Sequence, residues 1–258
     1  MIAEIIDGRA LARQVVEQVK AGMAVLPRTP GLAVILAGDD PASHVYVNSK
    51  TKLAREIGFL AEVIALPRDA TEERVLAEVA KLNARGEIDG ILVQLPLPNG
   101  INTLRVMAAI DPGKDVDGLH ALNAGLLSQG AEGLIPCTPL GCMKIIQSIL
   151  PDLTGQHAVV IGSSNIVGKP GLVRGDWIKP RALVIDVGTT RVEKPEGGHR
   201  IVGDVAFAEV SEVAGAITPV PGGVGPMTIA CLMENTLKAA RSRLRAAGHV
   251  IPDLVAHQ

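Results

Sequence analysis

The chain has 258 residues, of which 47% are apolar and 20% charged, a composition typical of one large or two modest soluble domains. Its net charge of −2, with Lys and Arg spread along the chain, excludes a basic surface for a nucleic-acid backbone or a membrane. Aromatic residues make up only 2%, which excludes a base-stacking platform, and no apolar run approaches the length of a membrane span.

Cysteine and histidine usage indicates neither disulfides nor a metal site. Cys137, Cys142 and Cys231 are odd in number and lack disulfide or zinc spacing, so we interpret them as small apolar residues in a reducing compartment. The six histidines show no metal-ligand spacing. Because the N-terminus also lacks the apolar segment of a signal peptide, we predict a cytoplasmic protein without a metal.

The first hundred residues alternate between helix and strand patterns. A helical pattern opens near Gly8 and runs to Met23, and a second helix is opened by Asp40 and closed by Gly58. Thr71 suits the N-cap of a third helix that ends near residue 83. Three apolar runs have the length of buried strands: residues 31–37, 61–66 and 89–95. This rhythm predicts a parallel α/β sheet, with ligands beyond the carboxyl ends of its strands.

The second half is predicted to form another α/β domain. Residues 112–139 are polar and glycine-rich, so we interpret them as the hinge side of this domain. Three apolar runs predict strands: residues 157–161, 182–188 and 216–220. A backbone-rich loop follows at 221–226, and a long amphipathic helix from Thr228 to about Ala247 closes the chain.

A glycine turn follows the run at 157–161. The pattern Gly162-x-Ser164-x-x-x-Gly168 departs from the standard dinucleotide fingerprint, so by itself it is a weak signal for a pyrophosphate site. Four helix-breaking residues interrupt the stretch before the next strand: Pro170, Gly171, Gly175 and Pro180. A crossover helix therefore cannot form there, and the turn lacks the helix dipole that would hold a phosphate.

The only tyrosine, Tyr46, stands four residues before Lys50 on the second predicted helix. Residues at this spacing share one helix face, so a phenol and an amine could act together on a substrate. From the spacing alone, the favoured interpretation is a surface Lys beside a half-buried Tyr. The rest of the chain reverses that preference.

Seven stretches, spread along nearly the whole chain, carry a family resemblance. They are Pro41-Ala-Ser-x-x-Tyr46-x-x-x-Lys50, Asp89-Gly-Ile-Leu-Val-Gln-Leu-Pro-Leu-Pro98, Lys114-Asp-Val-Asp-Gly118, Pro136-Cys-Thr-Pro139, Val159-Val-Ile-Gly162, Ser164-Asn-Ile-Val-Gly168 and Pro219-Val-Pro-Gly-Gly-Val-Gly-Pro-Met-Thr228. Their sequence and order resemble the bifunctional methylenetetrahydrofolate dehydrogenase/methenyltetrahydrofolate cyclohydrolase of bacterial type. The resemblance implies oxidation of 5,10-methylenetetrahydrofolate, hydrolysis of the methenyl product to 10-formyltetrahydrofolate, NADP as cofactor, a cytoplasmic homodimer and a role in purine biosynthesis.

The resemblance also implies site residues. Lys50 is the expected proton-transfer group, Tyr46 packs on the folate ring, Gln94 hydrogen-bonds the Lys, and Asp117 binds the pterin edge. A neutral amine beside an amide can activate water, and a carboxylate suits the paired N–H donors of a pterin. Further substrate contacts are expected from Leu95, Pro96, Pro221, Gly222 and Gly223. The expected cofactor contacts are Gly162, Ser163, Ser164, Ile166, Val167, Gly168 and Thr189.

The nucleotide half departs from the family. There, a helix, two strands and a second helix separate two Gly-Lys-Pro stretches, whereas here Gly168-Lys-Pro170 runs straight into Gly171-Leu-Val-Arg-Gly-Asp-Trp-Ile-Lys179. An internal segment that includes the family's contacts to the adenosine ribose phosphate is missing, so the sequence does not decide between NAD and NADP as the preferred cofactor. The stretch Asp186-Val-Gly-Thr-Thr-Arg191 also alters a contact near the cofactor. We therefore expect weakened NADP binding and an impaired dehydrogenase half.

The predicted fold is an α/β lobe with a parallel sheet plus a truncated Rossmann-like domain, with the C-terminal helix packing back on the first lobe. The predicted domains are 1–120 with 228–258 for folate and 133–227 for the nucleotide. A short-chain dehydrogenase also uses Tyr-x-x-x-Lys, but its glycine fingerprint lies upstream of that pair. The alternatives that stay open are a cyclohydrolase-only enzyme and a non-catalytic folate-binding protein.

Overall fold

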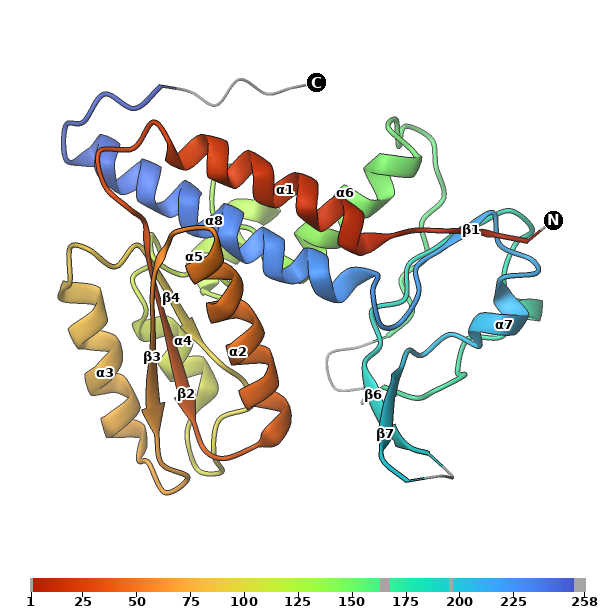
Figure 1. Ribbon diagram of the computed structural model, residues 1–258, viewed down its shortest axis with the longest axis horizontal. Coiled ribbons are helices and arrows are strands. Elements are labelled where there is room, and N and C mark those ends of the chain that lie inside the picture. Colours follow the sequence, from red (N-terminus) through yellow and green to blue (C-terminus); the bar gives the residue numbers. More distant parts are fainter. Residues whose placement is uncertain (1, 163–167, 195–196, 253–258) are drawn as a thin grey trace. The chain divides into compact units, whose positions relative to one another are not determined.

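The computed structural model describes residues 2–162, 168–194 and 197–252 (Figure 1). The chain forms two compact units. The larger unit consists of Gln14–Cys137 and Ile229–Gln258, and the smaller unit of Met1–Arg13 and Thr138–Thr228. Each unit has a parallel sheet of its own.

The sheet of the larger unit is parallel, as predicted. Its strands are β2 (Gly31–Ala37), β3 (Leu60–Leu66) and β4 (Gly90–Val93), in the order β3-β2-β4. Every residue of the central strand is buried, which explains why its sequence is a continuous apolar run rather than an alternating one. Beyond β4, Asp115 pairs in parallel with Ile91 and prolongs the sheet.

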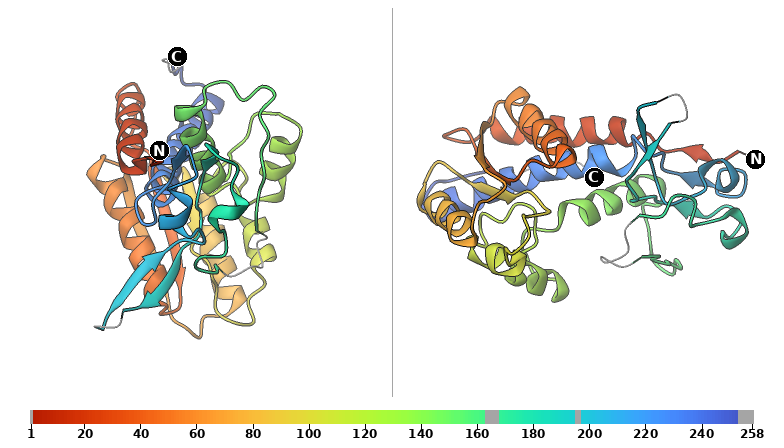
Figure 2. Two further views of the ribbon diagram at one scale, coloured as in Figure 1. Left: turned by 90° about the vertical axis from the view of Figure 1, so that its right-hand side faces the viewer. Right: turned by 90° about the horizontal axis from the view of Figure 1, so that it is seen from below.

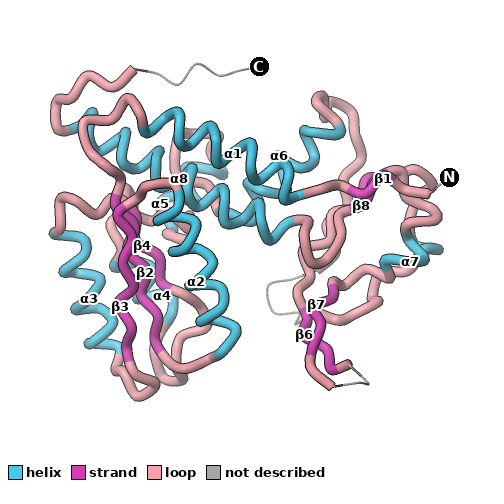
Figure 3. The backbone as a smooth tube through the Cα atoms, viewed as in Figure 1, coloured by secondary structure: helices cyan, strands magenta, loops and turns pink. Residues whose placement is uncertain are grey.

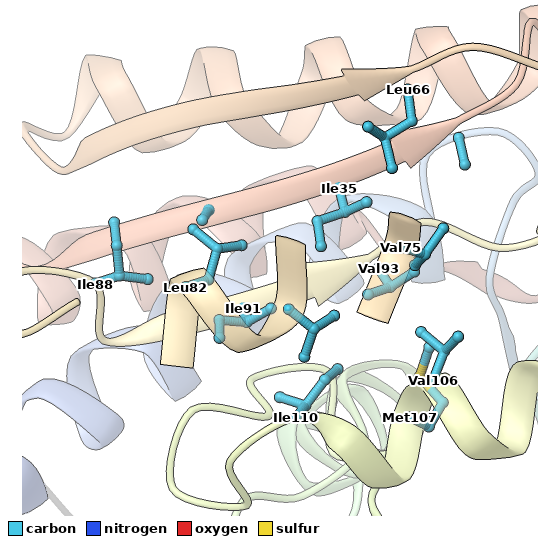
Figure 4. Packing of buried hydrophobic residues seen from close by; sticks show 13 residues of the cluster. Ile35, Leu66, Val75, Leu82, Ile88, Ile91, Val93, Val106, Met107 and Ile110 are labelled. Carbon is cyan, nitrogen blue, oxygen red and sulfur yellow. The ribbon is translucent and has the colours of Figure 1, made fainter. Parts of the chain in front are cut away.

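Helices cover both faces of this sheet. From the central strand β2 the chain passes through α2 (Pro41–Glu56) to β3 at one edge of the sheet. It then returns through α3 (Glu72–Ala84), past β2, to β4 on the other side. Right-handed crossovers then place α2 and α3 on opposite faces, as Figures 1 and 2 show. Figure 4 shows the cluster that α3 and α4 (Thr103–Ala109) form with one face of the sheet.

Local signals in the sequence set the helix ends. The Asp40 carboxylate accepts hydrogen bonds from the Ser43 backbone N–H (2.8 Å) and the Ser43 hydroxyl (2.7 Å) at the start of α2. Thr71 accepts from the Arg74 N–H at the start of α3. Gly58, with φ of +96°, turns the chain after α2 in a conformation that suits glycine. All three predicted helix boundaries are confirmed.

The last helix, α8 (Val224–Ala246), packs on the first lobe from Ile229 onward, as predicted. Arg243 donates to Asp89 (2.8 Å), whose carboxylate also takes two 2.6 Å hydrogen bonds from Arg28. Asp89 is fully buried, and a buried carboxylate is tolerated because the positive charges of Arg28 and Arg243 compensate it. The buried ion network ties α8 to the start of β4.

The stretch at 112–139 contains more helix than its glycine-rich sequence suggested. It contains α5 (Ala121–Ser128), and α6 (Cys137–Ile149) begins within it. His120 caps α5 by accepting a hydrogen bond from the Leu122 N–H (3.0 Å). Histidine is not among the residues preferred at this position, so the sequence did not predict the cap. The N-terminal helix α1 (Gly8–Met23) is confirmed at its predicted limits.

The smaller unit is built from short elements. Its sheet joins β1 (Glu4–Ile5), β8 (Ala216–Ile217) and β5 (Leu183–Val184) in the parallel order β1-β8-β5. A hairpin pairs β6 (Thr190–Glu193) with β7 (His199–Val202). Single turns of helix occur at η1 (Gly175–Trp177) and α7 (Phe207–Val210). Its core cluster consists of Ala3, Val210, Ala214 and Ile217.

The predicted strand at 157–161 is wrong. No residue of this run is in a strand, and Val159 and Val160 are 81% and 93% exposed. The strand predicted at 182–188 is also shortened, to Leu183–Val184. Figure 3 shows the described residues between α6 and β6 mostly as loop. An apolar run becomes a buried strand only when neighbouring strands and a covering helix exist, and the described residues supply neither to 157–161.

Candidate active site

The parallel register of the larger unit brings Gln94 and Asp117 to the same edge of the sheet. Gln94 follows the last residue of β4, and its backbone N–H donates to the Ile35 carbonyl (2.9 Å). Because Ile91 pairs in parallel with Asp115, Asp117 lies two residues further along, beside the end of β4. Both side chains therefore stand at the carboxyl end of the sheet, where ligands bind in such folds.

Lys50 reaches this edge from α2. Its ammonium nitrogen donates to Gln94 Oε1 at 3.0 Å, and the Gln94 amide donates onward to the Leu95 carbonyl (2.7 Å). Lys50 is only 8% exposed, whereas Tyr46, one turn earlier on the same helix, is 41% exposed. The spacing alone had suggested the opposite, a surface Lys beside a half-buried Tyr. The structure thus presents a buried amine below an accessible phenol.

Burial at this edge favours the neutral forms of its ionisable side chains. Burial lowers the pKa of Lys50, and the negative charge of Asp117 partly opposes that effect. Burial raises the pKa of Asp117, and Lys50 opposes this shift in turn. Burial and the neighbouring Asp117 raise the pKa of Cys137 well above its usual value, so its sulfur stays a thiol. An amine with a lowered pKa can accept a proton near neutral pH more readily than an ordinary Lys.

Two residues of this neighbourhood were not expected to serve the site. Cys137, interpreted from sequence as an apolar filler, donates its thiol to the Val116 carbonyl (3.2 Å), next to Asp117. Asn235 of α8 donates to the same carbonyl (2.9 Å). The Pro136–Pro139 stretch of the family pattern was a signal for Cys137. No local signal marked Asn235, because its partner lies 119 residues away.

The other expected substrate contacts fall in both units. Leu95 and Pro96 directly follow Gln94, joined by a cis peptide, and Pro96 is exposed. Pro221, Gly222 and Gly223 lie in the smaller unit. Gly223 has no room for a side chain, since a Cβ would lie 2.7 Å from the Pro219 carbonyl oxygen. The loop at 221–223 is therefore tightly folded within its own unit.

The nucleotide turn does not form a complete site in the described residues. Gly162 is exposed with φ of +130°, and Ser163, Ser164, Ile166 and Val167 lie outside the described residues. A Cβ on Gly168 would lie 2.5 Å from the Thr190 hydroxyl, and the neighbouring Thr189 is exposed. Among the described residues after the turn, no helix precedes the three-residue η1. These residues do not build the strand–turn–helix unit that holds a dinucleotide.

Comparison with known proteins identifies the family. A family model described as "Tetrahydrofolate dehydrogenase/cyclohydrolase, catalytic domain" matches residues 6–117. A second, "Tetrahydrofolate dehydrogenase/cyclohydrolase, NAD(P)-binding domain", matches residues 136–171 and 167–244. The chain belongs to this family. The predicted class, a bifunctional methylenetetrahydrofolate dehydrogenase/methenyltetrahydrofolate cyclohydrolase with NADP and a folate, is thereby confirmed.

Individual relatives agree. "Bifunctional protein FolD" of Gluconobacter oxydans is 48% identical, covering 93% of this chain and 93% of the relative. The crystal structure of the bifunctional FolD from Campylobacter jejuni superposes with a TM-score of 0.88 at 40% identity, covering 93% and 99% of the two chains. The enzyme of Trypanosoma brucei, complexed with NADP cofactor and inhibitor, gives 0.90 at 35% identity, covering 95% and 99%.

The matches also locate the missing segment. The alignment with the Gluconobacter relative spans 283 positions, more than the 258 residues of this chain, so part of the relative has no counterpart here. The NAD(P)-binding family model matches in two pieces that share residues 167–171. Both pieces therefore meet at Gly168-Lys-Pro170, where the sequence had indicated the deletion.

None of the helices in the described part of the chain has the length and apolar composition needed to span a membrane.

Proposed function

We propose that this chain hydrolyses 5,10-methenyltetrahydrofolate to 10-formyltetrahydrofolate, with Lys50 as the proton-transfer residue. The observation that carries the proposal is the 3.0 Å hydrogen bond from buried Lys50 to Gln94 beside Asp117. Burial supplies the lowered pKa that a Lys needs to act as a base. Membership of the family supplies the substrate class.

The chemistry follows from the amine. Neutral Lys50 takes a proton from water as its oxygen bonds to the carbon that bridges the two folate nitrogens N5 and N10. The bond from this carbon to N5 then breaks, and the protonated Lys50 returns its proton to N5. The hydroxyl that water leaves on this carbon loses its remaining proton to solvent as the formyl C=O forms, so the products are the 10-formyl compound and one proton. Gln94 acts by orienting the amine through its Oε1 acceptor.

Substrate recognition is assigned to three further groups. Asp117 accepts hydrogen bonds from the pterin N–H donors, and the exposed phenol of Tyr46 packs on the ring system. Leu95 and Pro96 line the approach after Gln94. The assignment of residues 1–120 with 228–258 to folate and 133–227 to the nucleotide, and the cytoplasmic homodimer implied by the resemblance, are parts of the same proposal.

The dehydrogenase half is proposed to be impaired. A dinucleotide is held by a glycine turn, the helix after it and ribose contacts from the next strand. The exposed run at 157–161 and the lack of a helix between Gly168 and η1 in the described residues support this. The hydrolysis step uses water and the groups around Lys50 and needs no nucleotide. Hydrolysis is therefore expected to survive where hydride transfer does not.

Lys50→Met tests the hydrolase assignment, and Lys52→Met on the same helix is its matched control. Lys50 is buried, whereas the Lys52 side chain is 76% exposed and forms a long ion pair with Glu56 at 3.8 Å. We expect Lys50→Met to abolish hydrolysis of methenyltetrahydrofolate and Lys52→Met to leave it within about twofold of the parent rate. Melting temperatures of both variants report folding, and full activity of a folded Lys50→Met would exclude the proposal.

The parent chain and its Lys50→Met variant also distinguish an enzyme from a folate-binding protein that does not catalyse. A non-catalytic folate-binding protein would bind tetrahydrofolate in calorimetry and show no hydrolysis above the uncatalysed rate in the parent chain. An enzyme shows both binding and a rate that depends on Lys50.

A further inference from the structure

We propose that Asn235 of α8 is a positioning residue that fixes Asp117 for folate recognition. The inference rests on the proposed role of Asp117 and extends it to a residue that does not itself touch the substrate. All the groups involved belong to the larger unit.

The Asn235 side chain joins the backbone of the residue before Asp117 to a second segment, at Ile135. Its amide nitrogen donates to the Val116 carbonyl at 2.9 Å and to the Ile135 carbonyl at 2.8 Å. It also lies 3.6 Å from Cys137 Sγ. Two N–H groups on one nitrogen thus satisfy two carbonyls from different segments, a pairing that an amide can make and a carboxylate or an apolar side chain cannot.

The Val116 carbonyl sets the direction of the Asp117 side chain. It belongs to the peptide that leads into Asp117, so two donors on its oxygen, Asn235 at 2.9 Å and Cys137 at 3.2 Å, fix the plane of that peptide. On the other side, Gly118 has φ of +72°, and a Cβ there would lie 2.5 Å from the Pro136 nitrogen. The backbone of Asp117 is therefore held at both ends.

Burial makes these hydrogen bonds consequential. Asn235 is only 3% exposed, and the Val116 residue is fully buried, so water cannot readily replace the amide as a donor. Without Asn235, the 116–117 peptide keeps the weaker thiol donor and gains freedom to rotate. Asp117 would then spend less time in the orientation that accepts both pterin N–H groups, and substrate binding would weaken.

A double-mutant cycle tests this coupling. We expect Asn235→Ala to raise the dissociation constant of tetrahydrofolate, which carries the pterin but no bridge to hydrolyse, by about tenfold. KM for methenyltetrahydrofolate should rise similarly, with kcat within about threefold of the parent. In an Asp117→Ala background the Asn235→Ala change should have almost no effect on binding, because the group it positions is gone.

The matched control is Asn83→Ala. Asn83 also makes two side-chain hydrogen bonds to backbone, donating to the Ala109 carbonyl (2.8 Å) and accepting from the Asp111 N–H (2.9 Å), and contacts none of residues 115–118 through them. It should lower stability without raising the dissociation constant. If Asn235→Ala unfolds, Asn235→Ser, which retains one donor in a smaller cavity, takes its place in the cycle, with folding checked by circular dichroism.

The outcomes are distinguishable. A tenfold effect that disappears without Asp117 supports the positioning role. Equal effects in both backgrounds, or no change in binding in a folded variant, overturn it. A parent chain that neither binds tetrahydrofolate nor hydrolyses the methenyl form would instead refute the proposed function.

Discussion

Replacing Gln94 by Glu should move the pH dependence of hydrolysis toward alkaline pH. The substitution puts a negative charge where Gln94 Oε1 now lies, 3.0 Å from the Lys50 ammonium nitrogen. An adjacent negative charge stabilises the protonated amine and raises its pKa. Because the reaction uses the neutral amine, the rate at a fixed pH must fall by the same factor as the neutral fraction.

The size of the shift can be bounded. Two unit charges 3.0 Å apart attract by roughly 5.5 kcal/mol at an effective dielectric constant of about 20. Gln94 is partly exposed, and desolvation of the new carboxylate offsets part of this attraction. Opposite charges at such distances shift pKa values by about one to three units. We therefore expect the rate at pH 7 to fall about 10- to 1,000-fold and to recover as the pH rises.

The assay is the pH profile of kcat/KM for methenyltetrahydrofolate, corrected for uncatalysed hydrolysis. In the parent chain the rate should rise with pH through the lowered pKa of Lys50, with an inflection below the ordinary value of 10.5. In Gln94→Glu the inflection should lie about one to three units higher. Gln129→Glu, an exposed position at the end of α5, is the control and should leave the profile unchanged. A Gln94→Glu profile with an unshifted inflection and a lower plateau would show that Lys50 is not the titrating group.

Three further outcomes are expected. Asp117→Ala should raise KM for the folate more than it lowers kcat, measured by steady-state kinetics, and the reverse pattern would contradict a binding role. Calorimetric titration with NADP should give no binding in the micromolar range, whereas a micromolar dissociation constant would show that another part of the chain replaces the missing unit. Asp89→Ala should cost about 3–5 kcal/mol of unfolding free energy in urea denaturation, because Arg28 and Arg243 would lose their buried counter-charge. A loss below about 1 kcal/mol would contradict that ion network.

The sequence predicted the candidate residues better than their environments. The i to i+4 spacing put Tyr46 and Lys50 on one helix face, but nothing local revealed which of the two the sheet would bury. Burial depends on the edge formed by β4 and the 114–118 segment, through the pairing of Ile91 with Asp115. The role of Asn235 was even harder to predict from the local sequence. Its role exists only because α8 packs beside a segment 119 residues earlier.

The fold was predictable where local and tertiary preferences agree. Asp40, Gly58 and Thr71 mark helix ends by capping and by glycine's freedom at positive φ, and these signals need no distant partner. A parallel strand, by contrast, forms only when a partner strand from elsewhere in the chain pairs with it. The run at 157–161 has the composition of a central strand, yet it has no pairing strand in the described residues, and Val160 is 93% exposed.

That exposure is the physical mark of the missing segment. The two matches of the NAD(P)-binding family model overlap at residues 167–171, where the sequence indicates the missing segment. The chain retains the apolar run at 157–161, but the described residues supply no strand or helix that covers it. Exposed apolar runs of high β-propensity invite pairing between chains, which makes this half the more prone to aggregate. The groups around Lys50 depend on none of these residues, since Gln94, Asp117 and Asn235 all belong to the larger unit. Loss of one activity with retention of the other is therefore what this division of the chain leads us to expect.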